Sequence, residues 1–267
     1  MMNIAEVLAI YDQQERREMR YPDVVRDVVP PIVRHINVPG RRSFIIYSTL
    51  DASNADETIA REAAFFAELG RDLEWKAYGH DQPDDLEQRL RAHGFEAEDP
   101  ETLLICDLND LPPTLQQPVT ADLRAVPHDG DLMPWIKDIL TVEEHVWETD
   151  MKWLGERLEH QLRTFPNFIS IYVAYIDGQP ASAAWINYPE HSQFASLYGG
   201  STLKAHRGQG LYTQLVAIRA QEAIRRGYHY LTIDASEMSR PIVEKNGFIT
   251  ASTATAYIKF ANPPASI

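Results

Sequence analysis

Residues 196–212 decide the fold of the C-terminal half of the chain, and they read SLYGGSTLKAHRGQGLY. A run of strand-forming residues leads into Gly208 and Gly210, and a helix with apolar residues at helical spacing begins at Leu211. The first N–H groups of a helix lack partners within the helix, and the helix dipole favours an anion beside them. Glycine has no Cβ atom, so a ligand can approach the backbone closely. The stretch therefore predicts a loop that binds a pyrophosphate group.

Two other phosphate-binding loops do not fit this stretch. The loop of nucleotide hydrolases ends in Gly-Lys-Ser/Thr, whereas Gly210 is followed by Leu211 and Tyr212. A dinucleotide-binding fold places three spaced glycines after the first strand of a βαβ unit. Here the glycine pair comes late in its domain, after a hairpin turned by Asp177-Gly178. The remaining alternative is an ordinary glycine turn that only starts a helix.

The flanking sequence predicts alternating strands and helices. The helix at 211–226 ends in Arg225-Arg226, which suits the helix dipole, and Gly227 stops it. Further helices are predicted at 133–148, 151–163 and 239–245, and strands at 121–126, 168–176, 181–188, 194–203, 228–233 and, as the closing strands, 247–260.

The N-terminal half contains a shorter version of the same ending. A helix at 57–69 stops at Gly70, and a strand at 73–78, a helix at 84–92, Gly94-Phe95 and a strand at 103–108 follow. This order suggests two related halves, although the spacings differ, so an unrelated first half stays open. Prolines at 112, 113 and 118 predict a linker. We therefore expect an N-terminal α/β domain over 1–117 and a second domain over 118–267.

Two motifs in the second half resemble the GNAT N-acetyltransferase superfamily. They are Arg207-x-x-Gly210 after a strand, and Glu244-Lys245-Asn246-Gly247-Phe248 later in the chain. The resemblance covers roughly residues 119–260 and implies an α/β fold with a mixed central sheet flanked by helices. It also implies an acyltransferase that uses acetyl-CoA as the acyl donor and a primary amine of a small or amino-acid-like molecule as the acceptor, by direct attack. The first half resembles the family only as a degenerate copy without the glycine loop.

The resemblance further implies which residues bind acetyl-CoA. They are Ser201, Thr202, Leu203, Arg207, Gly208, Gln209, Gly210, Leu211, Tyr212 and Ser236. Backbone N–H groups around 201–203 are expected to stabilise the developing oxyanion. Two positions depart from the family pattern. Tyr212 stands where the loop motif has a small residue, and Val243 stands where the family often has the tyrosine that protonates the leaving thiolate.

Acetyl transfer to an amine needs a base, because an alkylammonium group with a pKa near ~10 must lose a proton before it attacks. Glu143 is the candidate base, and Glu144, Glu190 and His191 are further choices. Tyr198, Ser236 and Ser239 are candidate replacement acids for Val243. Each of these side chains also has an ordinary structural explanation. A non-catalytic CoA-binding or sensing module is therefore the alternative function.

Composition limits the partners. The 267 residues carry a formal net charge of −14, so nucleic acid is a poor partner and a cationic amine is a suitable one. No metal site is predicted, because Glu143-Glu144-His145 lacks a second histidine at helical spacing. The single cysteine, Cys106, excludes an intramolecular disulfide, and no apolar run reaches the ~20 residues of a membrane helix. Without a recognisable signal peptide the expected compartment is the cytoplasm, and a homodimer stays open.

Overall fold

The computed structural model describes residues 2–262, which divide into two compact units. The first unit contains the chain up to Leu104, the segment Asp234–Pro241 and the chain from Thr250 onward. The second unit contains Ile105–Ile233 and Ile242–Ile249. Residues 250–262 therefore belong to the unit that the N-terminal half builds. The domain boundary expected between residues 117 and 118 rests on sequence motifs, and it stays a prediction.

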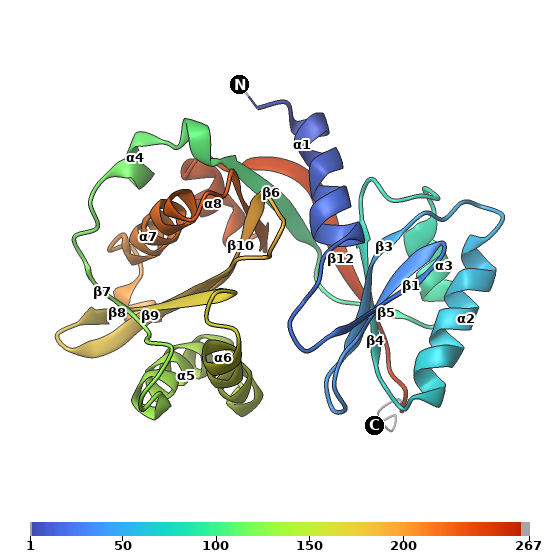
Figure 1. Ribbon diagram of the computed structural model, residues 1–267, viewed down its shortest axis with the longest axis horizontal. Coiled ribbons are helices and arrows are strands. Elements are labelled where there is room, and N and C mark those ends of the chain that lie inside the picture. The colour runs from blue at the N-terminus through green and yellow to red at the C-terminus, as the bar shows by residue number, and fades with distance from the viewer. Residues whose placement is uncertain (1, 263–267) are drawn as a thin grey trace. The chain divides into compact units, whose positions relative to one another are not determined.

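The second unit is a mixed sheet covered by helices. Its strands lie in the order β11-β10-β9-β8-β7, and only the β10–β11 pair is parallel. Helices α5 and α6 pack on one side of β8 and β9, and α7 packs on the other (Figure 1). The elements are α4 (Pro113–Gln116), β7 (Asp122–Ala125), α5 (Met133–Trp147), α6 (Lys152–Thr164), β8 (Ile169–Ile176), β9 (Gln179–Asn187), β10 (Phe194–Thr202), α7 (Leu211–Arg225), β11 (Tyr230–Ala235) and α8 (Arg240–Lys245).

The first unit is a second mixed sheet. Its strands lie in the order β1-β2-β3-β4-β12, with β5 beside β12, and only the β3–β4 pair is parallel. The elements are α1 (Ile4–Tyr11), a π-helical turn η1 (Asp12–Arg17), β1 (Val25–Val29), β2 (Ile32–Ile36), β3 (Ser43–Ser48), α2 (Ala55–Glu68), β4 (Leu73–Tyr78), α3 (Leu86–Ala92), β5 (Glu96–Ala97), β6 (Glu101–Asp107) and β12 (Ile249–Lys259). Within residues 2–262, no helix has the length and apolar character needed to cross a membrane.

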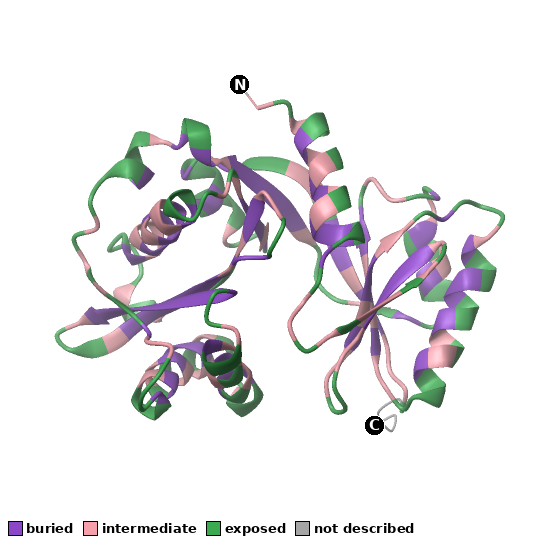
Figure 2. Cartoon of the chain, in the orientation of Figure 1, coloured by how far each residue is buried: buried purple, intermediate pink, exposed green. Residues whose placement is uncertain are grey.

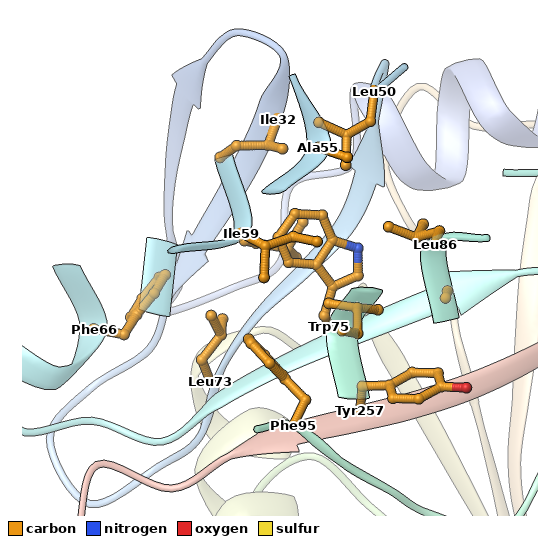
Figure 3. Close-up of a cluster of buried hydrophobic side chains, with 13 residues drawn as sticks. Ile32, Leu50, Ala55, Ile59, Phe66, Leu73, Trp75, Leu86, Phe95 and Tyr257 are labelled. Atoms are coloured by element: carbon orange, nitrogen blue, oxygen red, sulfur yellow. The ribbon is translucent and has the colours of Figure 1, made fainter. Parts of the chain in front are cut away.

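Trp75 on β4 lies in the core of the first unit (Figure 3). Ile59 and Phe66 come from one face of α2, seven residues apart, and Ile45 comes from β3. All four side chains are buried, whereas the outer face of α2 is exposed (Figure 2). Apolar residues at helical spacing thus fix α2 on the sheet, as the amphipathic pattern predicts.

The two units repeat one topology. In the first unit β3, α2 and the parallel strand β4 follow one another, and in the second unit β10, α7 and the parallel strand β11 do the same. The loop before α2 differs from the glycine loop before α7. Asp51 Oδ1 accepts hydrogen bonds from the N–H groups of Ser53 and Asn54 and from the Ser53 hydroxyl. The first unit therefore places its own carboxylate where the second has glycines.

The predicted elements of the second half agree closely with the observed ones. The exception is the C-terminal segment, which forms one long strand, β12, where closing strands were expected over 247–260. Gly247 follows α8 with φ of +86°, and a Cβ atom there would overlap the ring of Pro112. The glycine of the second motif thus lets α8 pack against the linker segment.

We expect Gly247→Ala to lower the free energy of unfolding by more than Gly227→Ala does. Both glycines follow a helix with nearly equal positive φ, but a Cβ atom at Gly227 meets nothing within 4 Å. The backbone strain of about 1–3 kcal/mol is common to both variants, and the overlap with Pro112 adds a similar amount to Gly247→Ala alone. Urea unfolding followed by tryptophan fluorescence measures the difference. Equal losses would show that Pro112 moves away without cost.

Candidate functional site

The predicted glycine loop leads directly into α7. Gly208 and Gly210 have φ of +77° and +80°, and Gly210 is the N-cap residue of the helix. A Cβ atom at either position would meet no atom within 4 Å. The glycines are therefore needed for their backbone conformation, and the face of the loop is open to a ligand. Lys204 and Arg207 are exposed beside it. Open N–H groups at a helix N-terminus with two nearby cations suit a pyrophosphate.

Strand β10 separates from β11 before it reaches this loop. The parallel register covers only Phe194–Ser196 with Tyr230–Thr232, whereas β9 pairs with β10 as far as Thr202. Among residues 2–262, the opposite edge of β10 therefore has no strand partner from Leu197 onward. Backbone N–H and C=O groups on an edge without a strand partner can pair with an extended ligand.

A β-bulge lies on this free part of β10. The register passes from Gly199 opposite Ala184 to Ser201 opposite Ala183, so Gly200 is the extra residue. Residues opposite each other in an antiparallel pair point to the same face of the sheet. Tyr198 lies opposite Trp185, and residues 183 and 185 share a face because they are two positions apart. The bulge therefore brings the side chains of Tyr198 and Ser201 to one face.

Glu143 on α5 meets this face. The Ser201 hydroxyl donates to Glu143 Oε2 at 2.8 Å, and the Trp147 indole N–H donates to the same oxygen at 3.2 Å. The side chain is buried with 2% exposure, and Oε1 has no hydrogen-bond partner. Burial raises the pKa of Glu143, although the bonds from Ser201 and Trp147 partly oppose the shift. The structure thus places a carboxylate with a vacant acceptor atom beside the strand that carries the loop.

Arg219 is a residue of this region that the sequence analysis missed. Its guanidinium is buried in α7 and donates to the carbonyl oxygens of Leu215 at 2.9 Å, Trp185 at 2.9 Å and Tyr198 at 3.2 Å. Burial lowers its pKa to about 10. The side chain ties α7 to β9 and β10 at the residue before the bulge. The available signal was a charged residue four positions after Leu215 on the apolar side of the helix.

Tyr212, the first departure from the family pattern, packs against the bulge. A Cβ atom on Gly200 would lie 2.7 Å from Cε2 of the Tyr212 ring. The bulge glycine thus makes room for the large side chain in the first turn of α7. The second departure, Val243, is buried in α8 and supplies no proton donor.

Of the remaining predicted residues, four lie in or next to the glycine loop and two lie in a segment assigned to the first unit. Thr202 accepts a bond from Arg207 Nε on its carbonyl oxygen at 3.1 Å, and the Leu203 N–H donates to Ala181 O at 3.0 Å. The Leu203 N–H is therefore engaged within the protein. Leu211 is buried and Gln209 is exposed. Ser236 and Ser239 lie in the segment assigned to the first unit, where their Oγ atoms are 3.2 Å apart.

This chain resembles a known family in one domain, and solved structures in its fold. Residues 132–248 match the acetyltransferase (GNAT) family. A GCN5-related N-acetyltransferase from Kribbella flavida is 18% identical with a TM-score of 0.68, and the match covers 97% of this chain and 96% of that one. A tandem GNAT protein from the clavulanic acid biosynthesis pathway is 13% identical with a TM-score of 0.60, over 99% of this chain and 89% of that one.

A GCN5-related N-acetyltransferase from Sphaerobacter thermophilus is 13% identical, has a TM-score of 0.57, and is matched over 98% of this chain and 87% of that one. No curated protein matches the chain. The loop and the bulged strand lie inside the matched segment 132–248, and the fold match extends through the first half. Residues 132–248 therefore form an acetyltransferase (GNAT) family domain, and the fold of the whole chain is that of solved GNAT proteins.

Proposed function

We propose that the protein transfers acetyl from acetyl-CoA to a primary amine of a small or amino-acid-like molecule by direct attack. The family match at residues 132–248 supports acetyl transfer in general. The observation that carries the finer proposal is the buried Glu143 carboxylate, which is bonded to Ser201 on β10 and keeps Oε1 free of protein partners. A carboxylate at this place can accept the proton that the amine must lose.

On the donor side, the chain binds and orients. The N–H groups of the loop and of the first turn of α7 bind the pyrophosphate, and Lys204 and Arg207 add positive charge. The free edge of β10 pairs with the amide-bearing arm of the donor. Acetyl-CoA bound in this way supplies the acetyl group as a thioester. The bulge at Gly199-Gly200 turns backbone groups of β10 toward the reacting carbonyl.

On the acceptor side, Glu143 takes the amine proton through a bridging water, because its carboxylate is buried. The net charge of −14 favours a cationic acceptor near the protein. Among the three candidate acids, Tyr198 shares the Ser201 face of β10 and is 40% exposed. The hydroxyl groups of Ser236 and Ser239 lie next to each other instead. We therefore assign protonation of the leaving thiolate to Tyr198.

The first test is calorimetric titration with acetyl-CoA. We expect Gly210→Trp to abolish binding, because an indole would fill the open face of the loop. Arg207→Ala should weaken binding about 10-fold or more, since a charge-assisted hydrogen bond contributes about 1.5–3 kcal/mol. Gly130→Trp is the matched control, because Gly130 also has φ of +77° and open space around it. No binding by the wild-type protein, or equal effects at Gly130 and Gly210, would refute the donor site.

The second test is the pH dependence of acetyl transfer to a panel of primary amines. We expect Glu143→Gln to lower kcat/KM by roughly 10²–10⁴, the contribution typical of a general base. In the wild-type protein the rate should rise with pH as Glu143 loses its proton, at a pKa above the ordinary carboxylate value.

In Glu143→Gln this limb of the profile should disappear. Glu144→Gln is the control, because the amide retains the Oε1 acceptor for the Met151 N–H. An unchanged limb in Glu143→Gln would assign the base elsewhere. Acetyl-CoA binding without turnover of any amine would instead indicate a sensing module.

A further inference from the structure

A serine, a histidine and an aspartate are linked by hydrogen bonds in the first unit. None of the three belongs to the candidate site in the second unit. Ser252 lies on β12, and His80 lies in the turn that follows β4. The distance from Ser252 Oγ to His80 Nδ1 is 2.8 Å. His80 Nε2 lies 3.0 Å and 3.1 Å from the two carboxylate oxygens of Asp12, the first residue of η1. These side chains are 172 and 68 positions apart in sequence, so only the fold brings them together.

The pattern of hydrogen bonds makes the Ser252 hydroxyl the donor to His80 Nδ1. Burial opposes ionisation of Asp12, but bonds from His80 and Arg16 outweigh it and lower the pKa of Asp12. An ionised carboxylate only accepts hydrogen bonds, so we assign the proton of the neutral ring to His80 Nε2, directed at Asp12, although Arg16 Nη1 also approaches this nitrogen. The neutral imidazole then presents an unprotonated Nδ1 to the Ser252 hydroxyl. This is the relation of nucleophile, base and orienting carboxylate that serine acyl-transfer centres use.

The Asp12 carboxylate is held in position by Arg16. Arg16, four residues after Asp12 on the π-helical turn, donates to Asp12 Oδ1 at 2.7 Å and to both oxygens of Asp81 at 2.6 Å and 2.8 Å. Its Nε donates to Ile46 O at 2.7 Å, and the guanidinium lies over the Tyr78 ring. π-helical turns of this kind are frequent at functional sites. Asp12 is thereby fixed in position beside His80.

The reacting groups are reachable from solvent. The His80 and Asp12 side chains are 26% and 28% exposed, and Ser252 is half-buried. Arg16 Nη1 lies 3.0 Å from His80 Nε2, but Asp12 and Asp81 supply two negative charges against this one. An imidazolium formed during a reaction would therefore still be stabilised.

We propose that Ser252, His80 and Asp12 form a second acyl-transfer centre, which hydrolyses small activated acyl esters. Ser252 Oγ attacks the ester carbonyl carbon and transfers its proton to His80 Nδ1. The alkoxide leaves with that proton, and Ser252 carries the acyl group. Water then attacks the acyl-serine with His80 again as base, releasing the carboxylic acid and restoring the serine. Asp12 keeps the ring in the required tautomer throughout.

The test uses the full-length protein with a fluorophosphonate probe and p-nitrophenyl acetate. We expect the probe to label Ser252, located by peptide mass spectrometry, and Ser252→Ala to abolish both labelling and ester hydrolysis. His80→Gln should slow both by roughly 10²–10⁴, because it removes the base. Asp12→Asn should slow both as well, since an amide no longer fixes the tautomer. Thr253→Ala, the exposed neighbour on β12, should leave both unchanged.

Two results would overturn the proposal. One is a wild-type protein that carries no label on Ser252 at saturating probe. The other is ester hydrolysis that is equally fast in Ser252→Ala and in the wild type, because the reaction would then take place elsewhere. Urea unfolding midpoints for each variant separate loss of the fold from loss of the nucleophile. Labelling of Ser252 in a correctly folded His80→Gln protein at the wild-type rate would likewise refute activation by His80.

Discussion

The parallel pairing of β10 with β11 ends after three residues, and the arrangement of the second unit depends on that separation. Beyond Ser196 this edge of β10 has no strand partner among residues 2–262, so the bulge at Gly200 can form there and the strand can end in the glycine loop. The bulge in turn sets Ser201 opposite Glu143 on α5. Arg219 holds the strand at this point from the other side of the sheet, through the carbonyl of Tyr198. A fully paired strand would offer neither the backbone groups nor the turned side chains.

Local signals made the loop, α7 and most strands of the second half predictable. Glycines before an apolar helix, and Gly227 after it, act within a few residues of each other. The Glu143–Ser201 contact joins residues 58 positions apart, and the bulge that permits it has no local signature beyond two adjacent glycines. The sequence therefore identified Glu143 as a candidate but not its partner. Arg219 was missed because a buried arginine bonded only to carbonyl groups contradicts the usual expectation for that residue.

The first unit was harder to predict for a related reason. Strands β1 to β3 and the π-helical turn η1 went unrecognised, because none of them carries a strong periodic signal. The residues Tyr78–Asp81 form a turn, closed by a hydrogen bond from the Asp81 N–H to Tyr78 O. Nothing local showed that His80 in that turn would meet Asp12 and Ser252 from opposite ends of the chain. The last strand, β12, was expected from its local pattern, but its pairing with β4 in the first unit was not.

The two loops that precede α2 and α7 give the units different relations to a ligand. In the first unit the Asp51 carboxylate accepts hydrogen bonds from the N–H groups of Ser53 and Asn54, just before α2. A negative charge of the protein itself therefore lies beside the start of that helix. In the second unit no side chain among the described residues caps α7. The N–H groups of this exposed start are left to water or to an anion. In the proposed function this helix start binds the pyrophosphate of the donor, so the donor would stabilise the second unit directly and the two halves need not unfold together.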